Sequence, residues 1–326
     1  MTVTATNHDH WSDAFQHEAL FYAGLDDFLA GTVPFVREGL EGDEPMLVAV
    51  PHERLRALQA ELDGSADRMT FLDMTEIGRN PAHIIPAWAD FLKRNGGGTV
   101  PVRGIGEPIW AGRTADELIE CQRHETLLNV AFARSGSWRL LCPYDTIGLP
   151  RDVIEEAERS HPWVSRADGW RDTSAQCRDL AAMAEPFDAP LPAPPAAAAT
   201  LRFGINDIAS ARNLVADMAT GAGLSSARVD DLVLAAHELV SNSVRHGGGI
   251  GTMRVWYDGQ AVVCEVTDNG RIELPLVGRQ VPADDSLGGR GIWMANQLCD
   301  LVQIRTFAVG NVVRLHMRAQ AATRTG

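Results

Sequence analysis

Short apolar runs alternate with amphipathic stretches in the first half of the chain. The runs are bounded by residues that break regular structure, which is typical of buried strands. They cover residues 46–51, 69–74, 99–106 and 138–145. Residues 81–94 and 114–134 lie between them and have helical spacing. This alternation predicts right-handed crossovers onto a mostly parallel sheet flanked by helices.

The second half of the chain has a different order of elements. Two predicted helices come first, each closed by a glycine, at residues 210–223 and 226–247. Two alternating runs over residues 252–270 follow, and Asp258-Gly259 between them is a strong hairpin signal. A polar stretch then precedes a helix over 290–300 and a second hairpin-like pair over 301–317. The order predicts a two-layer α/β sandwich, with helices on one face of a mainly antiparallel sheet.

A proline- and alanine-rich segment separates the two patterns. Clustered prolines in AEPFDAPLPAPPAAAAT cannot propagate a helix or a strand ladder, so residues 184–200 are predicted to be a linker. The segments just before it, residues 151–164 and 178–185, have helical spacing. We therefore expect one domain over residues 1–183 and a second over 201–326.

Composition and charge narrow the class of protein. The chain has 326 residues, 45% of them hydrophobic and 22% charged, a balance typical of a folded globular protein. Its 29 basic and 43 acidic residues leave a net charge of −14, which disfavours a direct nucleic-acid partner. The sequence has no signal-peptide pattern and no apolar stretch long enough to span a bilayer, so we expect a cytoplasmic protein without membrane contact.

The cysteines and histidines show no metal-ligand spacing. Five cysteines are widely separated, without a CxxC pair, and are interpreted as packing residues. Histidines can also bind zinc, but none of His10, His52 and His161 has a second histidine at a spacing suited to zinc.

Three clusters in the second half carry candidate chemistry. Glu238 and Asn242 are four residues apart on a predicted helix, so both project from one face. A carboxylate beside an amide oxygen can orient a water or hydroxyl and help to hold Mg²⁺. This pair alone is also compatible with an ordinary solvated helix face.

The other two clusters lie at a strand end and at a helix start. Asp268 ends an apolar strand, where its carboxylate can accept a hydrogen bond from the amine of an adenine, and Gly270 allows a close turn. The glycine-rich segment Gly288-Gly289-Arg290-Gly291-Ile292 opens a helix, whose unpaired N–H groups favour an anion. Taken singly, one is a turn and the other a hinge.

Together and in this order, the clusters resemble the N, G1 and G2 boxes of the GHKL ATPase superfamily. The resemblance covers about residues 201–317 and is greatest to the small anti-sigma-factor serine kinases. It implies a GHKL (Bergerat) fold that binds ATP and Mg²⁺. The chain departs from the family at Ile272, where a second glycine is usual, and at Asn311 and Val312, where threonines are frequent.

The resemblance also implies roles for single residues. Asn242 would ligate Mg²⁺ and Glu238 would be the catalytic base. Asp268 would bind the adenine amine beside Gly270, and residues 271–287 would form a short lid. The remaining implied nucleotide contacts are Arg245, His246, Gly288, Gly289, Arg290, Gly291 and Ile292.

The first half resembles a different family, the MEDS sensory domain, over about residues 17–163. That resemblance implies a RecA-like fold and a small-molecule ligand. Because the chain has no GxxxxGK[ST] loop here, we expect this domain not to hydrolyse ATP.

Polar and aromatic side chains of the first half are candidates for a ligand pocket. They are His17, Tyr22, Arg103, Glu107, Trp110, His124, Glu125 and Tyr144. Arg103, Glu107 and Tyr144 are expected to follow strands, at the sheet edge where open parallel sheets bind ligands. An internal hydrogen-bond network or an interdomain contact would explain these residues equally well.

The leading functional hypothesis is a regulator of transcription in a sigma-factor partner-switching pathway. The second domain would sequester a sigma factor or phosphorylate a serine of a STAS-type anti-anti-sigma protein, and the first would control it. The resemblance also implies a homodimer. Two alternatives stay open: an atypical sensor histidine kinase that uses His124, and a nucleotide-binding module without kinase activity.

Overall fold

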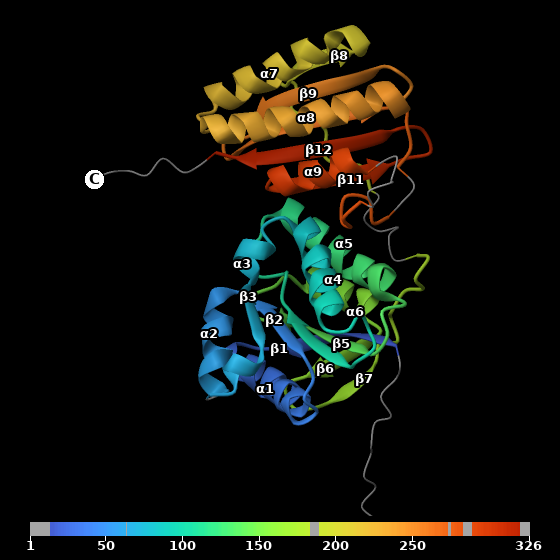
Figure 1. Ribbon diagram of the computed structural model, residues 1–326. Coiled ribbons are helices and arrows are strands. Elements are labelled where there is room, and N and C mark those ends of the chain that lie inside the picture. The colour runs from blue at the N-terminus through green and yellow to red at the C-terminus, as the bar shows by residue number, and fades with distance from the viewer. Residues whose placement is uncertain (1–13, 63, 183–188, 273–274, 283–288, 320–326) are drawn as a thin grey trace, which may run out of the picture. The chain divides into compact units, whose positions relative to one another are not determined.

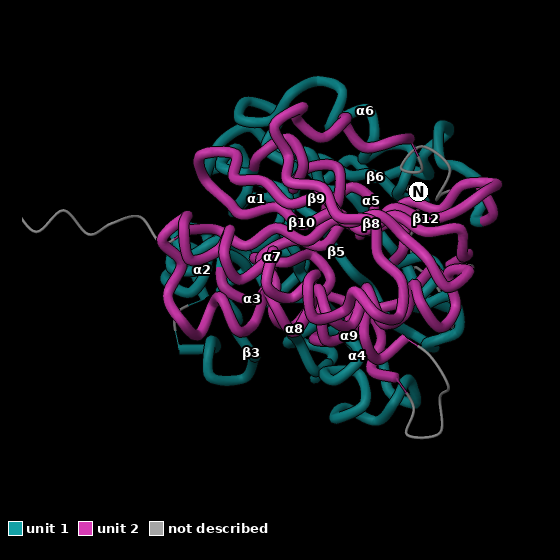
Figure 2. Tube along the Cα trace, turned by 90° about the horizontal axis from the view of Figure 1, so that it is seen from above, with its two compact units in different colours: residues 1–75, 88–113, 128–180 teal, residues 76–87, 114–127, 181–326 magenta. Residues whose placement is uncertain are grey.

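A computed structural model describes residues 14–62, 64–182, 189–272, 275–282 and 289–319. The chain forms two compact units, which are described separately (Figure 2). The first comprises residues 1–75, 88–113 and 128–180, and the second comprises residues 76–87, 114–127 and 181–326. Helices α4 (Ile84–Arg94) and α5 (Ala115–Phe132) each continue across a boundary of this division.

The first unit contains a seven-stranded sheet in the order β3-β2-β4-β5-β1-β6-β7 (Figure 1). All neighbouring strands are parallel except β6 and β7. The strands are β1 (Phe15–Tyr22), β2 (Met46–Val50), β3 (Thr70–Asp73), β4 (Val102–Gly106), β5 (Trp138–Asp145), β6 (Trp163–Arg166) and β7 (Arg171–Thr173). The predicted mostly parallel sheet is therefore confirmed.

Helices lie between successive strands of this sheet. They are α1 (Leu25–Glu41), α2 (His52–Glu61), α3 (Met74–Ile77), α4, α5 and α6 (Arg151–Ser160), with short 3₁₀ turns at Ala66–Arg68 and Pro81–His83. The helical spacing over 178–185 was misleading at residues 178–182, which form turns and irregular backbone, and residues 183–185 lie outside the described residues. The core packs Phe28 of α1 against strand residues such as Leu20, Val48, Ile105 and Leu141.

The second unit contains a five-stranded antiparallel sheet in the order β11-β12-β10-β9-β8. Its strands are β8 (Ala199–Phe203), β9 (Gly251–Tyr257), β10 (Ala261–Asp268), β11 (Leu301–Thr306) and β12 (Asn311–Arg318). Its helices are a 3₁₀ turn at Ile205–Asp207, α7 (Ile208–Gly221), α8 (Ser226–His246) and α9 (Arg290–Leu298), and α7, α8 and α9 lie on one face of the sheet (Figure 1). The predicted two-layer sandwich is confirmed.

The two faces of the antiparallel sheet differ in chemistry. Val255, Cys264 and Leu315 lie in the core that the helices cover. On the opposite face, Glu265 is paired across the strands with Arg254 and Arg314, and its carboxylate lies 2.5 Å from the nearer guanidinium nitrogen of Arg314. Burial raises the pKa of the Cys264 thiol to about 12, which agrees with its interpretation as a packing residue.

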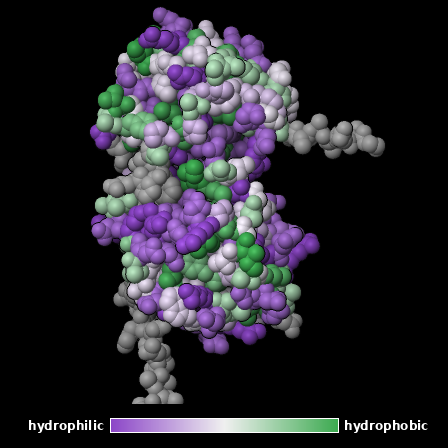
Figure 3. Space-filling view, turned by 180° about the vertical axis from the view of Figure 1, so that it is seen from behind, coloured by the Kyte–Doolittle hydropathy of each residue, from purple (hydrophilic) through white to green (hydrophobic). Residues whose placement is uncertain are grey.

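The surface is mainly hydrophilic, as the content of charged residues leads one to expect. In Figure 3, hydrophilic side chains are spread over both units, with smaller hydrophobic groups among them. Large exposed apolar side chains include Ile147, Val281 and Val309. Among the described residues, no helix is both long and apolar enough to cross a membrane.

Candidate functional site

One cavity of about 630 Å³ in the second unit is lined by residues of α8, β10, α9 and β12. Every described residue of the three sequence clusters lines it. These residues are Glu238, Asn242, Arg245, His246, Asp268, Gly270, Gly289, Arg290, Gly291 and Ile292. Gly288 lies outside the described residues. Clusters spread over residues 238–292 of the sequence thus meet in one site.

Helix α8 brings Glu238 and Asn242 to the cavity wall next to the start of α9. A Cβ atom at Gly291 would lie 2.7 Å from Nδ2 of Asn242 and 3.0 Å from Oε2 of Glu238. A Cβ at this position would force the Asn242 amide and the Glu238 carboxylate to shift, so glycine allows α9 to approach them as they stand. The opposite face of α8 buries Leu232, Ala236 and other apolar residues in the core, which fixes the orientation of the helix.

The Asp268 carboxylate is held by three hydrogen bonds at the end of β10. Its Oδ2 accepts from the hydroxyl of Ser243 at 2.5 Å. Its Oδ1 accepts from the backbone N–H of Gly270 at 2.7 Å and from the side-chain amide of Asn311 at 3.2 Å. An ionised carboxylate has about four acceptor positions, so Asp268 is oriented and keeps one acceptor position for a ligand.

Glycines allow the backbone to pass close to Asp268. A Cβ at Gly247, the residue that caps α8, would lie 2.6 Å from Cγ of Asp268. A Cβ at Gly270 would lie 3.0 Å from Cα of Gly247 and from the carbonyl oxygen of His246. The end of α8 and the turn after β10 are therefore in direct backbone contact, which only glycine at both positions allows.

Two polar residues of the site were missed by the sequence clusters. Ser243 follows Asn242 on α8, and its buried hydroxyl bonds Asp268. Asn311 lies directly opposite Asp268 in the β10–β12 register. Its Oδ1 also accepts from the N–H of Ile272 at 3.0 Å and from the hydroxyl of Thr306 at 3.2 Å. The signal for Ser243 was a small polar residue on the core-facing side of α8, where Ala236, Leu239 and Val240 are buried.

The departure at Ile272 has a structural counterpart. Its N–H is held by Asn311, while its side chain packs against the core of the second unit and lines the cavity. Val312 does not line the cavity, whereas the neighbouring Asn311 and Val313 do. Asn311 and the apolar side chains of Ile272 and Val313 thus form this part of the wall.

The start of α9 forms the third wall of the cavity. Gly289 caps the helix with φ +88°, a left-handed conformation that favours glycine. The first N–H groups of a helix have no partner within the helix, so those of Gly291 and Ile292 supply donors and a positive dipole end at this wall. The exposed side chains of Arg245 and Arg290 line the same cavity and add positive charge. This end of the cavity suits an anion.

The candidate polar residues of the first half of the chain do not gather in one pocket. The prediction that Arg103 and Tyr144 follow strands is wrong, because Arg103 lies inside β4 and Tyr144 inside β5. Arg103 is buried and bonds Glu44 and Glu38, each at 2.7 Å. These carboxylates hold the guanidinium in place, which is a structural role. Trp110 stacks on the guanidinium of Arg113, 3.8 Å from its ring centroid.

Glu107 does follow β4, and there it pairs with Tyr22 of β1. The Tyr22 hydroxyl donates to Oε1 of Glu107 at 2.7 Å, and Nε of Arg54 lies 3.4 Å from the same oxygen. Both side chains are buried, and burial raises the pKa of Glu107 to about 8 and raises the pKa of Tyr22. The strand-end position was predicted correctly. Glu107 and Tyr22 bond one another, and among the described residues Oε2 of Glu107 has no hydrogen-bond partner. His17 and Glu125 belong to a separate cluster, described below.

Comparison with known families assigns a class to each half of the chain. Residues 203–317 match the family described as the histidine kinase-like ATPase domain. Residues 16–162 match the family described as MEDS, the methanogen/methylotroph, DcmR sensory domain. The chain therefore joins a segment similar to MEDS sensory domains to a segment similar to histidine kinase-like ATPase domains, as both sequence resemblances implied.

Among solved structures, the chain is similar to the crystal structure of the RsbU and RsbW domains of Rv1364c from Mycobacterium tuberculosis. The match has 22% sequence identity and a TM-score of 0.28, and covers 38% of this chain. It covers 35% of the other chain, so this chain spans about a third of that protein's length in the match. Comparison with curated proteins finds no match.

Proposed function

We propose that the second unit binds ATP with Mg²⁺ and that the chain is a regulator acting through a sigma-factor partner-switching pathway. The observation that carries the proposal is the convergence of Glu238, Asn242, Asp268 and the start of α9 on one cavity. The match to histidine kinase-like ATPase domains supports ATP as the nucleotide. The cavity volume of about 630 Å³ lies within the usual range for small-molecule and cofactor sites.

The Asp268 end of the cavity suits a purine base. The carboxylate is oriented by Ser243 and Gly270, and it is a strong acceptor for the exocyclic amine of adenine. Ile272 and Val313 supply apolar surface on the wall next to it. A base would thus meet one charged acceptor on an otherwise apolar wall, the arrangement that gives orientation and specificity in small-molecule sites.

The other end of the cavity suits phosphates and a hard cation. Asn242 offers an amide oxygen of the kind that Mg²⁺ accepts. Gly291 and Ile292, after the Gly289 cap, offer helix N–H groups for phosphate oxygens, and Arg245 also lines the cavity. Glu238 is beside Asn242, where its carboxylate can take the proton of an attacking hydroxyl. Phosphoryl transfer depends mostly on positioning and charge neutralisation, which this arrangement can provide.

The partner is proposed from the related family. We expect the ATP-binding domain, residues 201–326, to sequester a sigma factor or to phosphorylate a serine of a STAS-type anti-anti-sigma protein. Residues 1–183 would act as the sensory domain, joined through the linker at 184–200, and the protein would act in the cytoplasm as a homodimer. The excess of acidic residues supports a protein partner over a nucleic acid.

The kinase step is tested by Glu238→Ala in the full chain. ³²P transfer from ATP to a co-purified STAS-type partner should fall by about 10²- to 10⁴-fold, because a general base is lost. ATP binding and partner binding should be retained. Asp230→Ala, on the exposed face of the same helix, should leave transfer unchanged.

The other outcomes separate the alternatives. Partner and ATP binding without transfer in the wild-type protein would identify a binding module. Acid-labile phosphate on the chain itself, removed by His124→Ala, would identify a histidine kinase. His124 is buried on α5 with 1% of its surface exposed, which disfavours a phosphoacceptor role.

A further inference from the structure

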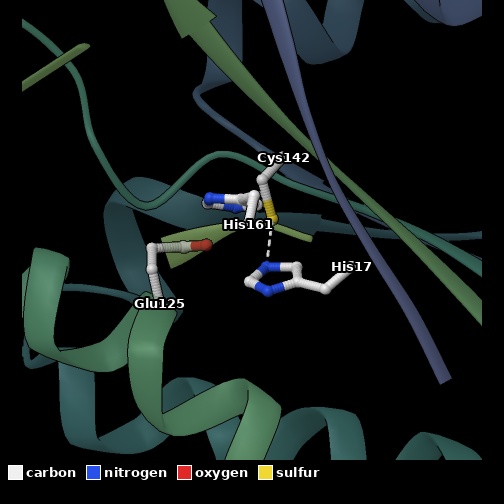
Figure 4. Close-up of side chains that lie close together, drawn as sticks. All are labelled: His17, Glu125, Cys142 and His161. Atoms are coloured by element: carbon white, nitrogen blue, oxygen red, sulfur yellow. Dashed lines mark hydrogen bonds between the residues drawn. The ribbon is translucent and has the colours of Figure 1, made fainter. Parts of the chain in front are cut away.

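Four metal-ligating side chains meet away from the nucleotide cavity. His17 lies on β1, Cys142 on β5, Glu125 on α5, and His161 follows α6. Their ligand atoms all lie within 4.8 Å of one another, and each residue has at most 1% of its surface exposed. Figure 4 shows the four side chains pointing toward a common centre. A closed set of two imidazoles, a thiol and a carboxylate is a chemically specific arrangement.

Sheet register brings His17 and Cys142 together. In the parallel β1–β5 pair, Ala19 is opposite Cys142 and His17 is opposite Leu140. Because side chains two residues apart share one face of a strand, His17 and Cys142 point to the same side of the sheet. Nε2 of His17 is 3.3 Å from Sγ of Cys142.

Hydrogen bonds set which nitrogen of His17 can bind a metal. The side-chain N–H of Asn129 donates to the carbonyl of Ser160 at 2.8 Å, so the oxygen of this amide faces His17. That oxygen lies 3.2 Å from Nδ1 of His17 and can only accept, which places the proton on Nδ1. Nε2 then carries the lone pair, and it is the nitrogen nearest to Cys142.

His161 is held in the same tautomer. Its Nδ1 lies 2.8 Å from the carbonyl oxygen of Ala157, which can only accept a hydrogen bond. The proton is therefore on Nδ1 and the lone pair on Nε2. Metal-binding histidines usually donate their other N–H to a carbonyl or a carboxylate in this way. Asn129 and Ala157 thus supply the supporting contacts that a metal site requires.

Glu125 is positioned by the same helix that carries Asn129. The two residues are four apart on the continuous helix α5, so they share one helix face. Since Asn129 is bonded to His17 and to the Ser160 carbonyl, the turn before it presents Glu125 to the same cluster. The carboxylate is therefore the fourth ligand in reach.

We propose that His17, Glu125, Cys142 and His161 bind one Zn²⁺ ion in a closed tetrahedral site. Zinc accepts nitrogen, sulfur and oxygen ligands together, and its bond lengths of about 2.0–2.3 Å place neighbouring ligand atoms roughly 3.3–3.6 Å apart. The His17–Cys142 pair already has such a spacing. Because all four ligand atoms lie within 4.8 Å of one another, no other pair needs to approach by more than about 1.5 Å. On binding, the Cys142 thiol releases its proton to solvent.

Charge balance also favours a dication at this place. One thiolate, one carboxylate and two neutral imidazoles carry two negative charges, which Zn²⁺ neutralises, so no net charge is buried. With all four positions taken by protein, the ion would be structural and would link β1, β5, α5 and the end of α6. The four ligands lie at positions 17, 125, 142 and 161, so no local spacing pattern predicts them.

The test uses cobalt as a spectroscopic probe of the full chain. The purified protein is stripped with a chelator and titrated with Co²⁺, followed by Zn²⁺. We expect one equivalent of Co²⁺ per chain, a near-ultraviolet cobalt–thiolate band with the strong visible bands of a tetrahedral ion, and their loss when Zn²⁺ is added. Cys142→Ser should abolish the thiolate band, whereas Cys121→Ser, a buried cysteine on α5, should keep it.

Further variants test the supporting contacts and guard against misfolding. Asn129→Ala should weaken Zn²⁺ binding about ten- to hundred-fold, while His52→Ala should leave it unchanged. Stoichiometric Zn²⁺ should also raise the melting temperature of the stripped wild-type protein. The proposal is overturned if the folded wild-type protein binds no stoichiometric Co²⁺ or Zn²⁺, or if folded Cys142→Ser keeps the thiolate band.

Discussion

Polar side chains gather at strand ends in both units, but with opposite outcomes. In the second unit, Asp268 is partly exposed and lines a cavity that Glu238 and Asn242 also line. In the first unit, Glu107 has none of its surface exposed and is bonded to Tyr22. A carboxylate at the same kind of position thus forms an open ligand wall in one unit and part of a closed network in the other.

Comparison of the two carboxylates indicates that the open site depends on residues without side chains near Asp268, and not on the polarity of the carboxylate itself. Around Asp268, glycines at 247, 270 and 310 remove the side chains that would otherwise fill the space. Around Glu107, the large side chains of Tyr22 and Arg54 occupy it. Variants around Asp268 should therefore change nucleotide binding as well as stability, whereas variants of Glu107 should change stability alone.

The largest expected effect is on stability, from Glu107→Gln. The pKa of Glu107 is raised from 4.5 to about 8 by burial, so the unfolded chain loses this proton at lower pH than the folded protein does. Wild-type stability should then fall by about 1.4 kcal/mol per pH unit between pH 4.5 and 8 from this group, and no further above pH 8. The variant should lack this slope and be more stable by up to roughly 5 kcal/mol at pH 8.

Urea denaturation of both proteins between pH 4.5 and 9 measures this effect. Glu61→Gln, at the exposed end of α2, is the matched control and should follow the wild type. Equal pH slopes for the wild type and Glu107→Gln would contradict the buried, protonated state of Glu107. ATP affinity should be the same in all three proteins.

The second largest effect on stability is expected from Gly310→Ala, in the turn before β12. Gly310 has φ +87°, and a Cβ there would lie 2.3 Å from the carbonyl oxygen of Asp268. We expect a loss of about 2–4 kcal/mol of unfolding free energy, from backbone strain plus displacement of the Asp268 strand end. ATP affinity should fall as well.

Gly259→Ala separates the two causes of that loss. Gly259 has φ +98° but no heavy atom within 4 Å of its Cβ position, so only the strain of about 1 kcal/mol applies. Thermal unfolding of the two variants gives the comparison. Equal losses would mean that the contact with Asp268 has no energetic weight.

The smallest effect is expected from Asn311→Ala. This change removes the hydrogen bonds to Asp268 and to the N–H of Ile272, which costs about 1–2 kcal/mol of stability. ATP binding should weaken several-fold, because the carboxylate loses one of its orienting donors. Asn213→Ala, on the exposed face of α7, should change neither quantity. Unchanged ATP affinity in Asn311→Ala would exclude Asn311 from the site.

The fold was largely predictable, because apolar periodicity reports local structure directly. The strands that escaped prediction have mixed patterns. β1 carries His17 and Glu18 in its buried middle, although it lies inside the parallel sheet. β8 begins at Ala199, inside the segment expected to be a linker, and pairs only with β9. Polar residues that are satisfied by distant partners interrupt the pattern, and a single sequence does not reveal those partners.

The site residues that lie in short sequence motifs could be predicted. Those that join the site through the pairing register of two strands could not. Glu238 with Asn242, and Gly289 with Gly291, are visible as short motifs. Asn311 joins the site because it lies opposite Asp268 across two strands, a relation that spans 43 residues. In the first unit, polarity alone did not distinguish the buried ion pair of Arg103 from a ligand contact.

Calorimetric titration of the full chain with ATP and Mg²⁺ tests most directly whether the three clusters form one nucleotide pocket. The account predicts saturable ATP binding. Asp268→Asn should weaken the affinity at least about ten-fold, equivalent to about 1.4 kcal/mol. Asp217→Asn, at an exposed position of α7, should leave it unchanged. Equal ATP affinity in the parent protein and in Asp268→Asn, with both folded, would contradict the account.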